Sequence, residues 1–197
     1  MVEGAVTAIA NQMANAVNPI RRLISKIEGT SYTELSPENV FLEFFNGPIT
    51  LNKTTDNCTV ALDCVAWVND GETTVNLRII SNPYLIVHEI FHVFDLTILD
   101  GDANQALLNA QDVDDNFPDR PGLDGPSDLR WGFAGSNFSD WQKSRSGLSG
   151  EEFADMGIGW TYNRWDSDID GLTEAGLYRA NFMNVNMGLW VYSQISQ

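Results

Sequence analysis

One stretch decides how this chain is organised: Leu85-Ile86-Val87-His88-Glu89-Ile90-Phe91-His92-Val93-Phe94-Asp95. It contains the pattern H-E-x-x-H, and His88 and His92 are the only two histidines in the chain of 197 residues. Positions four apart lie on the same face of a helix, so both imidazoles can reach one metal ion. Glu89 lies beside the pair, where its carboxylate can hold a water bound to that ion. This spacing is typical of zinc ligands with a neighbouring general base.

Apolar residues surround the three polar side chains and indicate that their helix is largely buried. Buried polar groups without partners are costly, so His88, Glu89 and His92 need a partner. The alternative to a metal is a pair of core histidines bonded to backbone carbonyls, with Glu89 paired to an arginine. Chance produces H-E-x-x-H in roughly one chain of this length in a few hundred, which favours the metal site.

The composition limits the partners of the protein. The formal net charge is −16, with only 11 lysine and arginine residues, which argues against nucleic acid and anionic membranes. No apolar run approaches the roughly 20 residues that span a bilayer, so we expect no transmembrane segment. We expect residues 1–197 to form a single domain, because 43% of them are hydrophobic and can fill one core. The oligomeric state cannot be predicted from these features.

We expect an extracellular or cell-envelope location, although polar residues interrupt the N-terminal apolar positions and argue against a secretory signal there. Cys58 and Cys64 can form a disulfide only if the chain bends between them, since six residues of straight strand span about 20 Å.

The first half of the chain predicts a helix, then strands, then the H-E-x-x-H helix. Apolar positions repeat every three or four residues over residues 2–28, and Asn18-Pro19 predicts that a second helix starts within this range. The aromatic run at residues 40–45 predicts a strand. Residues 59–68 and 73–80 are β-branched and partly alternating, and the turn signal between them predicts a hairpin. The H-E-x-x-H helix should cover about residues 84–99.

Residues 100–149 predict an irregular loop, rich in aspartate and aromatic residues, that is ordered and walls a cleft. Helical patterns return at residues 150–165 and at about 173–196. The order of elements is therefore an N-terminal helix, strands and the H-E-x-x-H helix in residues 1–99, the loop, and two helices in residues 150–197.

A catalytic zinc site with two histidines needs a third protein ligand and one open position for water. No third histidine exists, so this ligand must come from aspartate, glutamate or cysteine. Glu151 is the best candidate, because Asp155 follows it by four residues on the same helix face and can accept a hydrogen bond from a liganding imidazole. Glu152 and Asp102 are the rival ligands.

The stretches His88-Glu89-Ile90-Phe91-His92 and Glu151-Glu152-Phe153-Ala154-Asp155 resemble the active-site pattern of the gluzincin metallopeptidases, the thermolysin and neprilysin kind. The resemblance implies that His88, His92 and Glu151 bind Zn²⁺, that Glu89 is the general base, and that Asp155 supports His88. It also implies an α+β, zincin-like fold. In that fold a small, mostly antiparallel sheet packs on the active-site helix, and the C-terminal lobe is mainly helical.

Several members of that group steady the oxyanion with a further histidine, which this chain lacks. We expect Tyr178 and Arg179 of the last helix to take this catalytic role; otherwise they are ordinary core and surface residues. Tyr162 lies about 16 Å along a straight helix from Glu151, too far to help.

Asp166, Asp168 and Asp170 match the front half of a calcium loop, D-x-D-x-D-G, in which Gly171 is the glycine. The twelfth position is Leu177 instead of glutamate, so the loop is incomplete. It is either a Ca²⁺ site or a polar turn.

These patterns predict a zinc-dependent metallopeptidase that hydrolyses a peptide or protein substrate through a metal-activated water. The strand at residues 73–80 would be the sheet edge that receives the extended peptide. The alternative function is a non-catalytic binding or scaffold domain stabilised by zinc or calcium.

Overall fold

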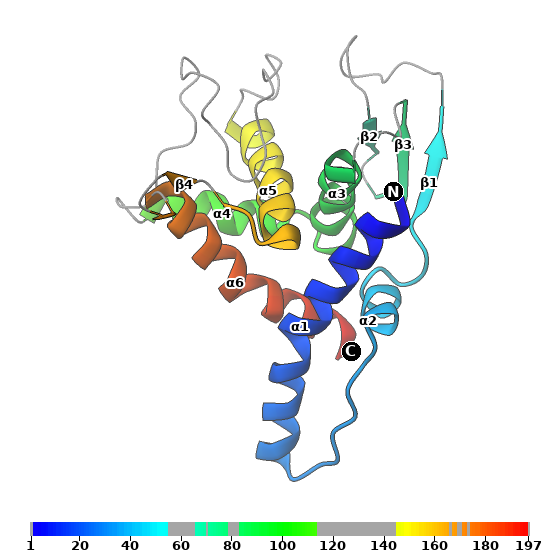
Figure 1. Cartoon of the computed structure of the whole chain (residues 1–197), viewed down its shortest axis with the longest axis vertical. Helices are drawn as coiled ribbons and strands as arrows, with labels where there is room; N and C mark the ends of the chain where they lie inside the picture. Colours follow the sequence, from blue (N-terminus) through cyan, green and yellow to red (C-terminus); the bar gives the residue numbers. More distant parts are fainter. Residues whose placement is uncertain are drawn as a thin grey trace.

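The computed structural model describes residues 2–54, 66–69, 71–78, 83–113, 145–165, 167–168, 171–172 and 174–196. The described part is α+β and mostly helical, with a small mixed sheet on one side of the helices (Figure 1). Cys58, Cys64 and the aromatic part of the predicted loop lie outside the described residues, so those predictions stay untested.

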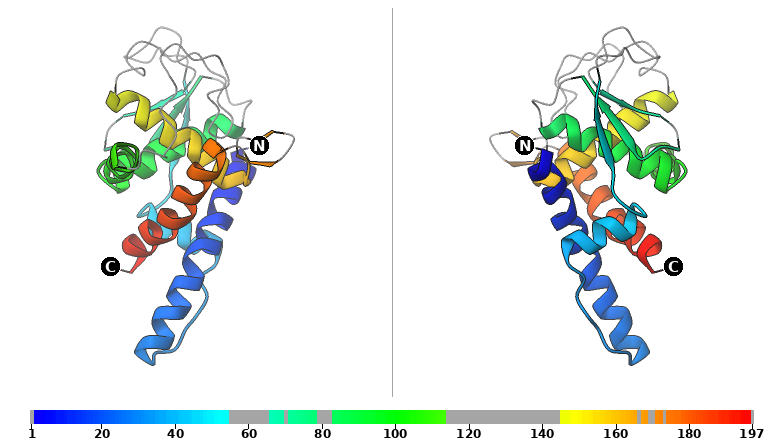
Figure 2. Two further views of the ribbon diagram at one scale, coloured as in Figure 1. Left: turned by 90° about the vertical axis from the view of Figure 1, so that its left-hand side faces the viewer. Right: turned by 90° about the vertical axis from the view of Figure 1, so that its right-hand side faces the viewer.

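The N-terminal segment is a single helix, α1 (Val2–Glu28), and the prediction of a second helix start at Asn18-Pro19 is wrong. The Asn18 side chain does not cap a helix. Its Nδ2 donates to the carbonyl of Leu35 at 3.0 Å, and its Oδ1 accepts from the backbone N–H of Leu35 at 3.1 Å. The buried stripe that includes Met13 and Val17 continues through the proline, so tertiary packing outweighs the helix-breaking tendency of Pro19. The last turns of α1 project beyond the other elements (Figure 2).

Residues 40–45 were predicted to form a strand, but they belong to α2 (Pro37–Phe44) and its C-cap. Ser36 begins this helix, because its side chain accepts a hydrogen bond from the N–H of Asn39 at 3.2 Å. Pro37 supplies a favourable first helical position. These start signals outweigh the strand preference of the aromatic residues.

Three strands form the sheet, in the order β1-β3-β2. β2 (Ala66–Val68) pairs antiparallel with β3 (Thr74–Leu77), which confirms the predicted hairpin pairing. β1 (Thr50–Lys53) was not expected, and it pairs parallel with β3. The sheet is therefore mixed rather than mostly antiparallel. β3 has a neighbour on each side, so the prediction that this strand is the open edge for a peptide is wrong.

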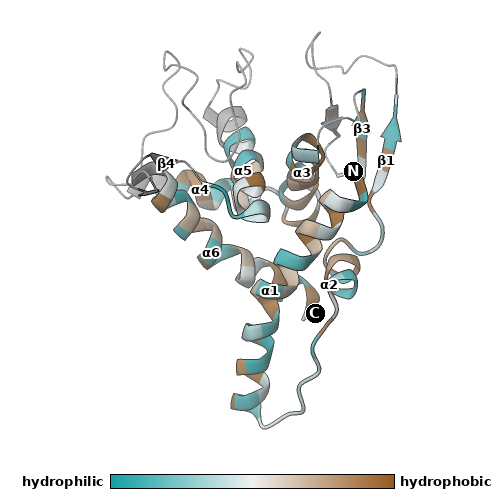
Figure 3. Ribbon diagram, viewed as in Figure 1, coloured by the Kyte–Doolittle hydropathy of each residue, from teal (hydrophilic) through white to brown (hydrophobic). Residues whose placement is uncertain are grey.

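The H-E-x-x-H helix is α3 (Pro83–His92), which continues into a π-helical segment, η1 (Val93–Ile98). Figure 3 shows that α3 is strongly apolar, as its sequence predicted. Residues 100–149 were expected to be irregular, but their first part forms α4 (Asp102–Val113). The buried Asp95 carboxylate stabilises the start of α4 by accepting the N–H of Asn104 at 3.0 Å. The loop prediction is wrong for these residues.

The C-terminal part contains α5 (Arg145–Tyr162) and α6 (Glu174–Ile195), which confirms the two predicted helices. A short pairing of β4 (Ser167–Asp168) with β5 (Gly171–Leu172) lies between them. α3 and α5 lie side by side in the centre of the molecule (Figure 1). Among the helices in the described part, none is both long and apolar enough to span a membrane.

Candidate metal centre

The candidate site lies between α3 and α5, which run in opposite directions. His92 at the end of α3 faces Glu151 near the start of α5, and His88, one turn earlier, faces both Glu151 and Asp155. Further along the contact between α3 and α5, the rings of Tyr84 and Tyr162 pack edge to face, with their centroids 5.2 Å apart. This antiparallel register brings together two sequence segments about sixty residues apart.

Ligand atoms of three residues converge at this contact. Nε2 of His88 lies 3.1 Å from Nε2 of His92 and 3.2 Å from Oε2 of Glu151, and Nε2 of His92 lies 3.6 Å from Oε1 of Glu151. A tetrahedral zinc ion with ligand bonds near 2.1 Å separates its ligand atoms by about 3.4 Å. The spacing and the donor set of two imidazoles and one carboxylate therefore fit a zinc ion.

Asp155 fixes the orientation of His88. Its Oδ1 lies 2.9 Å from Nδ1 of His88, so Nδ1 carries the proton and donates it to the carboxylate. This tautomer leaves Nε2 of His88, the nitrogen that faces His92, with its lone pair available to a metal. The structure thus places Asp155 where the sequence predicted it, on the far nitrogen of His88.

The two histidines have opposite pKa shifts. Burial lowers the pKa of His88, but hydrogen bonds to Asp155 and Glu151 and their negative charges outweigh burial and hold the pKa well above 6.5. Burial lowers the pKa of His92 to about 4, although the charge of Glu151 opposes that shift. His92 is therefore neutral at pH 7, whereas the metal-free site keeps a proton on His88 that a bound cation would displace.

Glu89 is buried next to the cluster, and burial raises the pKa of its carboxyl to about 7. The positive charge of His88 lowers this pKa and the negative charge of Glu151 raises it. A carboxyl with a pKa near neutrality can take a proton and release it again, as a general base and acid must.

The shifted pKa of Glu89 predicts how stability depends on pH in the metal-free protein. Between pH 4.5 and 7 the folded chain holds this proton more tightly than the unfolded chain, so the contribution of Glu89 to stability falls as pH rises through that range. Glu89→Gln removes this loss. The variant should exceed the parent by up to about 3 kcal/mol in unfolding free energy at pH 8, and should match it at pH 4. Urea titrations in the presence of a chelator would measure both unfolding free energies. Equal stability of the variant and the parent at pH 8 would contradict the raised pKa of Glu89.

The rival ligands lie elsewhere. Glu152 is fully buried and its Oε1 accepts a hydrogen bond from Nε of Arg179 at 2.9 Å, within an ion pair between α5 and α6. Asp102 is exposed in the first turn of α4. Of the three candidates, Glu151 is the one whose carboxylate faces both imidazoles.

The predicted oxyanion residues are both on α6. Arg179 is buried beside Glu152, so its guanidinium lies against the ligand helix and contributes to the contact between α5 and α6. Tyr178 is half-buried at the edge of the core. Their catalytic role stays a prediction.

The predicted calcium residues are only partly described. Asp168 lies in β4, where its backbone pairs with Gly171, whereas Asp166 and Asp170 lie outside the described residues. The calcium prediction therefore also stays a prediction.

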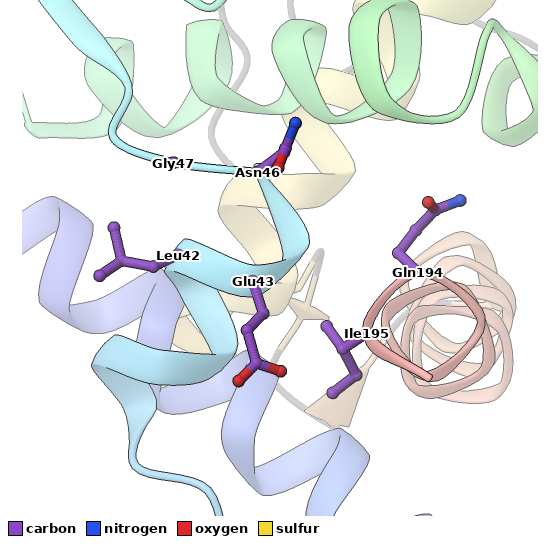
Figure 4. Close-up of a pocket in the computed structure, with 6 residues that line it drawn as sticks. All are labelled: Leu42, Glu43, Asn46, Gly47, Gln194 and Ile195. Carbon is purple, nitrogen blue, oxygen red and sulfur yellow. The ribbon is translucent and has the colours of Figure 1, made fainter. Parts of the chain in front are cut away.

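A separate hollow lies between the end of α2 and the last turn of α6 (Figure 4). It shares no residue with the candidate metal site. Among the described residues that line it, Glu43 is the charged one; these residues are Leu42, Glu43, Asn46, Gly47, Gln194 and Ile195.

Two residues that join the helices around this centre were not predicted from the sequence. Asp95, three residues after His92, joins the π-helical segment to α4; its signal was a carboxylate inside an apolar helix. Gly157, two residues after Asp155, lies against the ring of Phe91; its signal was a glycine inside a helical pattern.

Comparisons with protein-family models, with curated proteins and with solved structures found no match to this chain. A functional conclusion must therefore come from the site itself.

Proposed function

We propose that this protein is a zinc-dependent metallopeptidase with a gluzincin-type centre and a zincin-like arrangement of its elements. One observation carries the proposal: ligand atoms of His88, His92 and Glu151 all lie within 4.8 Å of one another, with Glu89 buried beside them. A closed structural zinc site would use four protein ligands and would need no buried glutamate next to it.

Each residue has a separate task in the proposed reaction. His88, His92 and Glu151 would hold the zinc, which when bound supplies Lewis acidity and lowers the pKa of its water toward neutrality. Glu89, buried beside these ligands, takes a proton from the attacking water and returns it to the leaving amine. Asp155 keeps the proton of His88 on Nδ1, so that Nε2 stays a ligand.

The fold indicates where a peptide substrate would bind. β2 and β1 are the outer strands of the described sheet, and β2 contacts α3. An extended peptide substrate would therefore add to the β2 side of the sheet instead of to β3.

Metal removal tests the proposal directly. The purified chain should bind one zinc per molecule, and dialysis against a chelator should abolish cleavage of denatured casein and of a quenched-peptide library. Added zinc should restore cleavage, and the metal content should be followed by mass spectrometry. A chain that binds one zinc without hydrolysing any peptide would support the non-catalytic alternative, and a chain that binds none would contradict the metal centre.

A further inference from the structure

The contact between α3 and α5 depends on a residue without a side chain. A Cβ atom placed on Gly157 would lie 2.2 Å from Cγ of Phe91 and 2.3 and 2.5 Å from its two Cδ atoms. Real Cβ atoms do not approach other heavy atoms this closely. The face of the Phe91 ring therefore lies directly on the backbone of α5.

The ring of Phe91 is fixed by its surroundings. Its side chain is 1% exposed, and its ring centroid lies 5.5 Å from that of Phe94, 5.8 Å from Phe153 and 6.3 Å from Trp160. A densely packed aromatic core cannot take up a displaced ring without moving helices. A side chain at position 157 would therefore move α5 away from α3.

Gly157 and Asp155 both contact α3, but they lie on different sides of α5. His88 and Phe91 are three residues apart and so share one face of α3. Asp155 and Gly157 are two residues apart, which places them about 160° apart around α5. α5 is thus held between the hydrogen bond of His88 with Asp155 at 2.9 Å and the ring of Phe91 on Gly157.

We propose that Gly157 is a positioning residue of the metal centre: it sets the separation of α3 and α5 at which Glu151 and Asp155 reach the two histidines. The inference rests on the proposed metal site. Ligand distances in such sites hold within about 0.2 Å, whereas relief of a 2.2 Å approach requires a much larger displacement. Gly157 acts through Glu151 and Asp155, and it has no direct role in the chemistry.

The test is zinc affinity per folded molecule, measured by competition with a chromophoric chelator. Gly157→Ala should weaken zinc binding at least roughly tenfold, as changes in the support of a metal ligand do. Gly150→Ala is the matched control, since a Cβ on Gly150, directly before Glu151, would meet only Nδ2 of Asn104 at 3.9 Å. This control should bind zinc as tightly as the parent.

Gly159→Ala separates positioning from general destabilisation. Its Cβ would lie 2.9 Å from the carbonyl of Arg164 and from the ring of Trp165, so the three atoms nearest to it lie just past the end of α5 and not in α3. It should lower the melting temperature and leave zinc affinity unchanged. Phe91→Ala added to Gly157→Ala makes room for the new methyl group and should recover part of the lost affinity.

Unchanged zinc affinity in Gly157→Ala, or equal losses in Gly157→Ala and Gly159→Ala, would overturn the proposal. If Gly157→Ala does not fold, Phe91→Leu is tested instead. This variant loses the aromatic ring that packs on Gly157, so zinc binding should weaken several-fold. Zinc affinity equal to that of the parent would overturn the proposal.

A measurement without metal keeps this inference separate from the proposed function. The chain has two histidines, so imidazole NMR spectra of the metal-free protein resolve the Nδ1 proton that His88 shares with Asp155. This signal should persist in Gly150→Ala and disappear in Gly157→Ala. A parent that binds no zinc would contradict the metal centre alone, whereas persistence of the signal in Gly157→Ala would contradict the positioning role.

Discussion

Glu89→Gln is expected to lower kcat for peptide hydrolysis by roughly 10²–10⁴-fold while the protein keeps its zinc. The amide has nearly the size of the carboxyl group but cannot accept a proton from the attacking water. Glu89 is not one of the three converging ligands, so metal content should stay at one zinc per chain. The effect should fall on kcat far more than on KM, because the lost proton transfer occurs in the transition state.

The matched control is Glu43→Gln, the same change at an exposed glutamate of α2. It should leave both kcat and zinc content at parental values. Steady-state kinetics on one quenched peptide, with zinc measured in the same samples, would compare the variants. Parental kcat in zinc-loaded Glu89→Gln would show that Glu89 is not the base.

The cluster of His88, His92 and Glu151 could be predicted from the sequence in part, because helical spacing is local and fixed. His88 and His92 share a helix face wherever that helix lies, and the same holds for Glu151 and Asp155. The local pattern does not give the distance between the two helices. That distance depends on the contact of Gly157 with Phe91, which joins residues more than sixty positions apart.

The errors in the fold prediction have the same physical origin. The aromatic run at residues 40–45 has strand propensity, yet the cap at Ser36 and the burial of Phe41 and Phe44 in the core make it helical. Pro19 has a strong local tendency to end a helix, yet the buried stripe of α1 continues through it. β1 joins the sheet by parallel pairing with β3, a long-range contact that no local pattern indicates.

The adjacent residues Glu151 and Glu152 provide the sharpest prediction, because the same substitution should have opposite effects at the two positions. Glu151→Gln should weaken zinc binding by more than the roughly 10–100-fold typical of changes in outer-shell partners, since it replaces a ligand itself. Its metal-free stability should change by about 1 kcal/mol or less. Asp155 still pairs with His88, and the weakened contact between position 151 and His88 is offset by removal of the repulsion between Glu151 and Glu89.

Glu152→Gln should leave zinc affinity close to that of the parent and destabilise the fold by on the order of 3 kcal/mol. Arg179 is 2% exposed and Glu152 fully buried, so the change removes the negative charge from a buried ion pair. Urea denaturation in a chelator measures the stability, and chelator competition measures the zinc affinity. If Glu152→Gln lost zinc and Glu151→Gln kept it, the register of α5 against α3 would be shifted by one residue, and Glu152 would be the third ligand.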